Sequence, residues 1–215
     1  MMNRKQADSQ VLISTHPLVQ HKLALLRDER SDPKKFRELV REIAALLVYE
    51  ATADLATEPV VVQTPLGRAE GRWLAEKVGL VPVLRAGLGM VEGAWQALPG
   101  AEVWHIGLAR DRRTLDPVEY YALRPVSPAV DICLVLDPLV ATGGSAVAVV
   151  DILKRWGAQR IKFISILAAR PGVQRFTAAH PDVPLYLAAM DPQLNEAGYI
   201  VPGLGDIGDR LFGTG

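Results

Sequence analysis

The chain has 215 residues, 49% of them hydrophobic and 22% charged, so it is long and apolar enough for a single domain with a substantial core. Its 24 basic and 24 acidic residues give a net charge of zero, which argues against nucleic acid or an anionic membrane as a partner. A single cysteine, Cys133, excludes a disulfide scaffold and a cysteine-based zinc site. The sequence shows neither a secretory signal nor a bilayer-long apolar run, so we expect a cytoplasmic protein.

Two helices are predicted near the N-terminus, after a short extended segment at 11–14. Thr15 is the expected cap of the first helix, which begins near Pro17. Ser31-Asp32-Pro33 has the capping side chain and first-turn proline of a second helix start, and apolar residues then recur at helical spacing to about Tyr49. We expect these helices to form a packing or dimerisation layer without a catalytic part.

From residue 60 onward, predicted strands alternate with predicted helices. The strands are expected at 60–62, 78–84, 103–107, 132–136, 161–168 and 185–190, and the helices at 87–98, 145–156 and 173–179. Residues 118–123 are expected to form an antiparallel strand or hairpin arm, whereas 68–77 is ambiguous. The predicted fold class is therefore α/β: a mostly parallel sheet flanked by helices, with an N-terminal helical layer and a small antiparallel arm.

The C-terminal tail differs from the rest of the chain. Six of the 18 glycines lie between Gly198 and Gly215, and glycine disfavours both helix and strand. The segment is nevertheless too apolar for disorder, so we expect an ordered loop whose backbone groups are available for recognition. The chain is then one domain over 1–215, with an arm and helices at 1–55, an α/β core at 56–190 and the tail at 191–215.

The strongest chemical signal lies between Leu134 and Ser145. An apolar strand ends at Asp137, and Thr142-Gly143-Gly144-Ser145 opens a helix. Free N–H groups at such a helix start suit a phosphate, and a carboxylate at the end of a strand can bind a ribose diol. A capped turn without any ligand fits these residues equally well. The missing lysine excludes a Walker A loop, and the missing closing glycine argues against a nucleophile elbow.

Two further stretches can bind anions. Arg85 precedes a glycine-containing turn that extends to Gly93, which suits a pyrophosphate but also loosely imitates a dinucleotide-binding fingerprint. Arg110-Asp111-Arg112-Arg113 can close over a polyanion, although a solvated charged loop is the usual meaning of such a run. His16 and His21 are five residues apart and do not share a helix face, so no metal site is predicted.

Together these stretches resemble the uracil phosphoribosyltransferase family, and the resemblance runs from about His16 to Thr214. The segments that carry it are His16-Pro17-Leu18-Val19, Tyr49 to Asp54, Arg85 to Met90, Asp137 to Ser145, and Leu194 to Asp206. The resemblance implies the transfer of the 5-phosphoribosyl group from 5-phosphoribosyl 1-diphosphate to uracil, giving UMP and diphosphate in pyrimidine salvage. It makes the tail a base-recognition segment.

The resemblance also implies roles for individual residues. Catalytic residues would be Arg85, Arg110, Asp137 and Asp206. Phosphoribosyl diphosphate would contact these four together with Pro138, Leu139, Val140, Ala141, Thr142, Gly143, Gly144 and Ser145. Uracil would contact Ile200, Gly205, Asp206 and Ile207. Mg²⁺ would bind mainly through the diphosphate rather than at a protein metal site, GTP is an expected activator, and a homodimer or higher homo-oligomer is expected.

The sequence departs from the family pattern at three places. Ile207 stands where the family usually has alanine and would crowd the base if its side chain pointed into the pocket. Leu139-Val140 replaces Met-Leu, and Arg112-Arg113 stands where acidic residues are common. Two alternatives remain: a regulatory protein of the same fold that binds pyrimidine nucleotides and RNA, and a dinucleotide-dependent oxidoreductase that uses Gly87 to Gly93.

Overall fold

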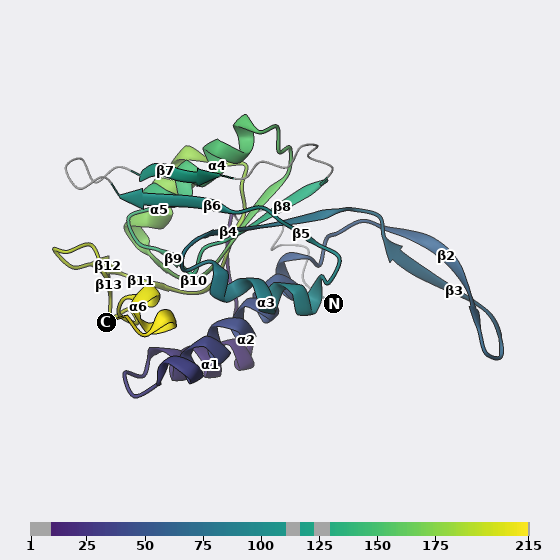
Figure 1. The fold of residues 1–215 in the computed structure, drawn as a ribbon, viewed down its shortest axis with the longest axis horizontal. Helices are drawn as coiled ribbons and strands as arrows, with labels where there is room; N and C mark the ends of the chain where they lie inside the picture. The colour runs from purple at the N-terminus through teal and green to yellow at the C-terminus, as the bar shows by residue number, and fades with distance from the viewer. Residues whose placement is uncertain (1–9, 111–116, 123–129, 215) are drawn as a thin grey trace.

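The structure is a computed structural model that describes residues 10–110, 117–122 and 130–214 (Figure 1). In chain order its elements are β1 (Val11–Ile13), α1 (Pro17–Arg27), α2 (Pro33–Ala51), β2 (Thr57–Thr64), β3 (Gly67–Leu74), β4 (Val78–Leu84), α3 (Leu88–Ala97), β5 (Glu102–Val103), β6 (Ile106–Arg110), β7 (Pro117–Ala122), β8 (Ile132–Leu136), β9 (Leu139–Val140), α4 (Gly144–Arg155), β10 (Ile161–Ala169), α5 (Arg170–Ala179), β11 (Leu185–Asp191), β12 (Gln193–Leu194), β13 (Ile200–Val201) and α6 (Ile207–Phe212). None of the described helices is long and apolar enough to cross a membrane.

The central sheet has the strand order β1-β11-β10-β8-β4-β6-β7, with β5 paired to β4 and β9 paired to β10. These strand pairs are parallel except β6 with β7, which is antiparallel. The predicted α/β class, with its mostly parallel sheet and antiparallel arm, is confirmed. Because parallel strands run in one direction, the carboxyl ends of β4, β8 and β10 meet at one edge of the sheet.

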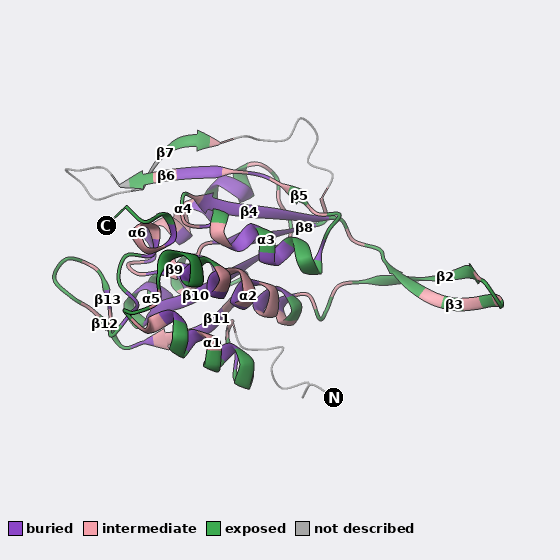
Figure 2. Ribbon diagram, turned by 60° about the horizontal axis from the view of Figure 1, so that its bottom comes forward, coloured by how far each residue is buried: buried purple, intermediate pink, exposed green. Residues whose placement is uncertain are grey.

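Helices cover both faces of the sheet (Figure 1). α1, α2, α3 and α6 pack on one face, where Leu80 and Leu134 point, and α4 and α5 pack on the other, where Val81 and Val135 point. Successive side chains of a strand point alternately into these two cores. A strand that is buried on both faces therefore has a continuous apolar sequence. Figure 2 shows the resulting burial of β4, β8 and β10.

The N-terminal helices confirm the predicted layer but correct one cap. His16, not Thr15, caps α1, and its Nδ1 accepts a hydrogen bond from the backbone N–H of Leu18 at 3.2 Å. Pro17 occupies the first helical position, which leaves the residue directly before it as the cap. Asp32 caps α2 as predicted, and its side chain accepts from the N–H of Lys35 at 2.8 Å.

Two other sequence predictions were wrong in detail. The single strand expected at 103–107 is divided into β5 and β6, with Trp104 and His105 between them. The tail expected to be a loop contains the antiparallel pair β12–β13 and the helix α6. α6 forms because Asp206 caps it and Gly213, at φ 66°, ends it, so two residues that disfavour a helix interior stand at its boundaries.

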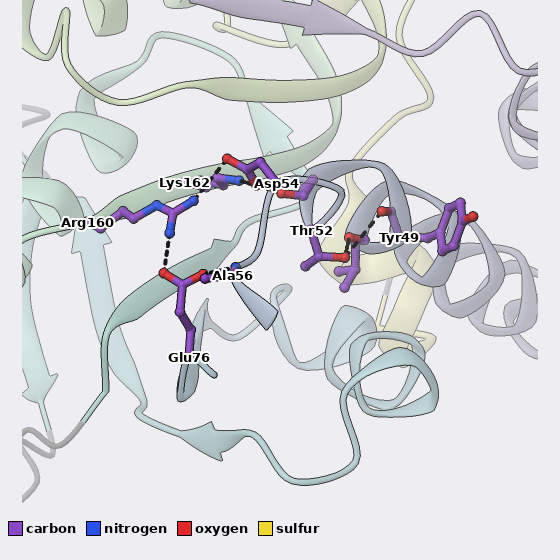
Figure 3. Close-up of polar contacts among 9 residues, drawn as sticks. Tyr49, Thr52, Asp54, Ala56, Glu76, Arg160 and Lys162 are labelled. Atoms are coloured by element: carbon purple, nitrogen blue, oxygen red, sulfur yellow. Dashed lines mark hydrogen bonds and ion pairs between the residues drawn. The ribbon is translucent and has the colours of Figure 1, made fainter. Parts of the chain in front are cut away.

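The ambiguous segment 68–77 contains the second strand of a hairpin. β2 and β3 pair in register from Thr57 opposite Leu74 to Thr64 opposite Gly67, and the hairpin projects away from the body (Figure 1). Its base is tied to the sheet by polar contacts among Asp54, Glu76, Arg160 and Lys162 (Figure 3). Glu76 also accepts from the N–H of Ala56 at 2.7 Å, so the two ends of the hairpin are held together.

Candidate functional site

A cavity of about 410 Å³ lies where β4 and β8 end. Three segments that are distant in the sequence form most of its lining: the end of β4 with the turn after it, the loop from β8 to α4, and the C-terminal tail. The predicted site residues that line it are Arg85, Asp137, Leu139, Val140, Ala141, Thr142, Gly143, Ser145, Ile200, Gly205 and Asp206. The topology brings them together because the first two segments follow the carboxyl ends of neighbouring parallel strands.

The structure does not place the other four predicted site residues in the cavity lining. Pro138, Gly144 and Ile207 are absent from the cavity lining. Arg110 ends β6, but its side chain lies outside the part of the chain that the structure describes, as do Arg112 and Arg113. The side chain of Ile207 is 5% exposed and packs in the core beneath α1, α2 and α3. It therefore does not crowd the cavity.

The loop from β8 to α4 depends on a glycine. Gly143 caps α4 with a φ of 79°, a left-handed conformation that side chains rarely adopt. A Cβ on Gly143 would lie 2.6 Å from the carbonyl oxygen of Gly172 in α5. No side chain caps the first turn of α4, and the Thr142 and Ser145 hydroxyls have no recorded hydrogen-bond partner among the described residues. The loop can therefore offer amides and hydroxyls to an anion.

Asp137 brings a carboxyl group to the cavity lining. The residue follows the buried strand β8 and is itself half-buried, with its backbone N–H donating to Ile164 O at 3.2 Å. Desolvation by the surrounding protein raises the pKa of Asp137 to about 7, although a hydrogen bond from the backbone of Leu139 opposes the shift. The carboxyl therefore titrates near neutral pH before any ligand is bound.

The turn after β4 carries a cation and two glycines required by packing. Arg85 is exposed, and its guanidinium carbon lies 5.6 Å from the ring centre of Phe212 in α6. A Cβ on Gly87 would lie 2.3 Å from Leu136 O, and one on Gly93 would lie 2.0 Å from Arg41 O. Close approach to β8 and α2 thus explains these glycines without a bound dinucleotide, which removes the main support for the oxidoreductase alternative.

The tail contributes two stretches to the cavity lining, 197–200 and Gly205-Asp206. Gly205 has a φ of 81°, and Asp206 is exposed and uses Oδ1 to accept from the N–H of Asp209 at 3.0 Å. The cap leaves the second carboxylate oxygen of Asp206 for other contacts. Within the described ranges, no group of three or more His, Cys, Asp or Glu side chains could hold a metal ion.

Several lining residues were not predicted. Ala197, Gly198 and Tyr199 come from the turn between β12 and β13, and they adjoin or lie within the tail segment that carried the resemblance. The others are small or apolar residues next to predicted ones: Val83, Leu84, Ala86, Leu108 and Ala146. The Tyr199 segment and Ala86 had a sequence signal, because both lie in stretches that carry the resemblance. The other residues had none, because an apolar residue at a strand end looks the same with or without a cavity beside it.

Comparisons with known proteins find the same family along nearly the whole chain. Residues 13–214 match the family described as uracil phosphoribosyltransferase. A uracil phosphoribosyltransferase from Roseiflexus sp. (strain RS-1) is 61% identical over 207 residues, which are 96% of this chain and 100% of the relative. One from Symbiobacterium thermophilum is 58% identical and covers 96% of this chain and 99% of its own.

Solved structures show the same fold. A protein from Aquifex aeolicus has a TM-score of 0.88 at 37% identity, covering 95% of this chain and 98% of its own. A hypoxanthine phosphoribosyltransferase from Staphylococcus aureus is only 9% identical, with a TM-score of 0.51 over 74% of this chain and 76% of its own. The second similarity concerns the fold alone.

Proposed function

The chain belongs to the uracil phosphoribosyltransferase family, and from this premise we propose how its cavity performs the reaction. The enzyme transfers the 5-phosphoribosyl group of 5-phosphoribosyl 1-diphosphate to uracil, giving UMP and diphosphate in pyrimidine salvage. A bond forms between a uracil nitrogen and the anomeric carbon while the bond from that carbon to the diphosphate oxygen breaks. The proton on the nitrogen passes to the released diphosphate or to water.

The loop from β8 to α4 is proposed to hold the phosphoribosyl group. Asp137 accepts hydrogen bonds from the ribose hydroxyls, and the backbone and hydroxyls from Ala141 to Ser145 bind the 5-phosphate. The observation that carries this assignment is the juxtaposition, in one cavity, of a carboxylate and a helix start whose first turn has no side-chain cap. Pro138 and Gly144 would shape the loop, since neither lines the cavity.

The leaving diphosphate needs positive charge, and Arg85 and Arg110 are proposed to supply it. Phosphoribosyltransferases generally use Mg²⁺ with this substrate. The cavity's carboxylates, Asp137 and Asp206, fit an ion held mainly by substrate oxygens, because Mg²⁺ is commonly bound through one or two carboxylates and phosphates. When bound, Mg²⁺ would neutralise part of the charge that develops on the diphosphate. Arg85 and Arg110 would orient the diphosphate and stabilise the rest.

Uracil is proposed to bind against the tail, at Ile200, Gly205, Asp206 and the backbone of Ile207. Uracil presents a carbonyl, an N–H and a second carbonyl along one edge, which exposed backbone N–H and C=O groups can complement. Cytosine would put an amino group and an unprotonated ring nitrogen against those groups and leave them unpaired, a costly mismatch in a desolvated site. Asp206 would also reach the phosphoribosyl substrate, since one of its oxygens is not used by the helix cap.

The test is release of diphosphate from 5-phosphoribosyl 1-diphosphate and Mg²⁺, with uracil, cytosine, hypoxanthine and orotate supplied separately. Release with uracil alone, with UMP identified as the product, is the expected result. Release with another base would keep the phosphoribosyl assignments and overturn those of the tail. Each assay is repeated with GTP, whose proposed role as an activator predicts faster UMP formation. No release with any base would favour the regulatory alternative.

A homodimer or higher homo-oligomer is proposed, and the hairpin β2–β3 supports it. Val62 and Trp73 are exposed on one face of the hairpin, and Val61 and Leu74 on the other. An isolated two-stranded hairpin is marginally stable in water, so apolar side chains on both faces favour a partner. We keep a single domain over 1–215 and a cytoplasmic location as further parts of this proposal, without nucleic acid or membrane as partners.

A further inference from the structure

One ion pair holds the middle of the tail. Arg27, at the end of α1, donates from both Nη atoms to the two carboxylate oxygens of Asp191, each at 2.7 Å. Gly203 joins the same cluster twice: its carbonyl accepts from Arg27 Nη1 at 2.8 Å, and its N–H donates to Asp191 Oδ2 at 2.9 Å. The Asp191 side chain is only 8% exposed, so these bonds are shielded from water.

Gly203 lies between the two parts of the tail that line the cavity. Ile200 lies on one side of it in the sequence, and Gly205 and Asp206 lie on the other. The turn is tight, because Gly203 has a φ of 63° and an added Cβ would lie 2.0 Å from Ile200 O. With both its N–H and its C=O bound, Gly203 has a fixed peptide orientation. The position of the neighbouring cavity residues then depends on that orientation.

A second arginine ties the tail to the same helical layer. Arg210 of α6 donates to Leu26 O and Leu204 O at 2.9 Å and to Asp28 O at 2.6 Å, and its guanidinium lies 4.3 Å from the ring centre of Phe36. The end of α1, the start of α2 and the tail are therefore joined by a network of polar contacts. Packing alone would leave the tail backbone freer to shift.

We propose that Arg27 and Asp191 are positioning residues for the base: they hold the peptide groups of Gly203 so that the tail presents its recognition groups to uracil. The inference rests on the proposed assignment of the tail to uracil. It gives the N-terminal helices, expected from sequence to have no part in catalysis, an indirect role in base recognition. Among the described residues, the β8–α4 loop makes no hydrogen bond or ion pair with Arg27 or Asp191, so the effect should be confined to the base.

The test compares two cations on α1. Arg27→Met removes the pair with Asp191, whereas the control, Lys22→Met, removes an ion pair between Lys22 and Glu42 that has the same 2.7 Å separation but does not touch the tail. For Arg27→Met we expect the KM for uracil to rise about tenfold, with the KM for 5-phosphoribosyl 1-diphosphate changed by less than about twofold. Lys22→Met should leave both values within about twofold.

Two additional, more conservative variants keep the test valid if Arg27→Met does not fold. Arg27→Lys keeps the charge but loses the bidentate hydrogen bonds to Asp191. Its KM for uracil should therefore lie between those of the unmodified protein and Arg27→Met. Asp191→Asn keeps the side-chain shape and should also raise the KM for uracil. A thermal unfolding midpoint for each variant shows whether it is folded at the assay temperature. If Arg27→Met is unfolded there, these two conservative variants carry the test.

Amide hydrogen exchange gives a readout independent of activity. Peptides covering 200–206 should exchange faster in Arg27→Met than in Lys22→Met, because Asp191, which accepts from the N–H of Gly203, is then no longer held in place by Arg27. An unchanged KM for uracil in folded Arg27 variants, or an equal rise in both KM values, would overturn the inference. Failure of the unmodified protein to form UMP from uracil would instead overturn the proposed function, so the two failures are distinguishable.

Discussion

Asp137 is the residue at which the fold bears most directly on the proposed binding of the phosphoribosyl group. Its pKa of about 7 arises because β8 delivers the carboxyl into a partly desolvated site where, among the described side chains, no cation is recorded to offset the burial. A charged group held this way is costly in the free protein and becomes favourable when a ligand donates hydrogen bonds to it. Two predictions follow from this carboxyl, one for the substrate and one for stability.

Asp137→Asn should weaken binding of 5-phosphoribosyl 1-diphosphate by roughly ten- to a hundredfold, since hydrogen bonds to a charged acceptor contribute about 1.5–3 kcal/mol. In the unmodified protein the affinity should rise as the pH increases through about 7, because the carboxyl loses its proton there. Titration of the substrate also contributes, so the prediction concerns the difference between the two proteins. Calorimetric binding at several pH values measures it, and identical pH profiles would contradict the role of Asp137.

Asp137 should also make the protein less stable as the pH rises. Its pKa is about 7 when folded and near the ordinary 3.8 when unfolded, so between these values the folded state binds the extra proton. The free energy of unfolding should then fall by up to about 1.4 kcal/mol per pH unit in this window. Urea unfolding at several pH values should show this decline in the unmodified protein and a smaller decline in Asp137→Asn. Equal slopes would rule out the raised pKa.

Among the elements, the loop from β8 to α4 depends on two glycines packed against each other. Gly143 and Gly172 belong to different segments, and each would place a Cβ within 2.6 Å or less of the other segment's backbone. The conformation of Gly143 is recognisable from its position before a helix. Its contact with α5 is not, because it depends on how α4 and α5 pack over the sheet.

Gly143→Ala should therefore disturb both stability and substrate binding. The matched control is Gly157→Ala, because Gly157 also has a positive φ, 93°, but an added Cβ would meet nothing within 4 Å. We expect the control to lose about 1 kcal/mol of unfolding free energy and to keep both KM values. Gly143→Ala should lose more and raise the KM for 5-phosphoribosyl 1-diphosphate about tenfold or more. Equal effects from the two substitutions would show that the contact with Gly172 is unimportant.

For the whole molecule, the projecting hairpin is the feature that a single copy of the chain leaves unexplained. Val62→Glu with Trp73→Glu should shift the protein from an oligomer toward the monomer, because a charge at a buried interface is costly. Light scattering after size-exclusion chromatography measures the mass. Tyr120→Glu, an exposed aromatic on β7, is the control and should leave the mass unchanged. A monomeric unmodified protein would contradict the proposed assembly.

Features with a local signal could be predicted from the order of the residues. Apolar runs identified the buried strands β4, β8 and β10, and Asp32-Pro33 identified the start of α2, because periodicity and caps are properties of neighbouring residues. Asp137 and the loop that follows it could be identified as a candidate site for the same reason, and their roles toward ribose and phosphate stay predictions. The family resemblance added the proposed role of the tail in base recognition, whereas composition alone indicates only a glycine-rich loop.

Contacts between distant segments, in contrast, follow from the assembled fold. In the fold, the side chain of Ile207 lies in the core, and residues 57–64 pair with residues 67–74. Arg27 contacts Asp191, which is 164 positions away in the sequence. An arginine at a helix end and an aspartate at a strand end have no periodic or spacing signal that links them. Their contact exists because the helical layer packs on the sheet face where β11 ends, and that packing is a property of the assembled fold.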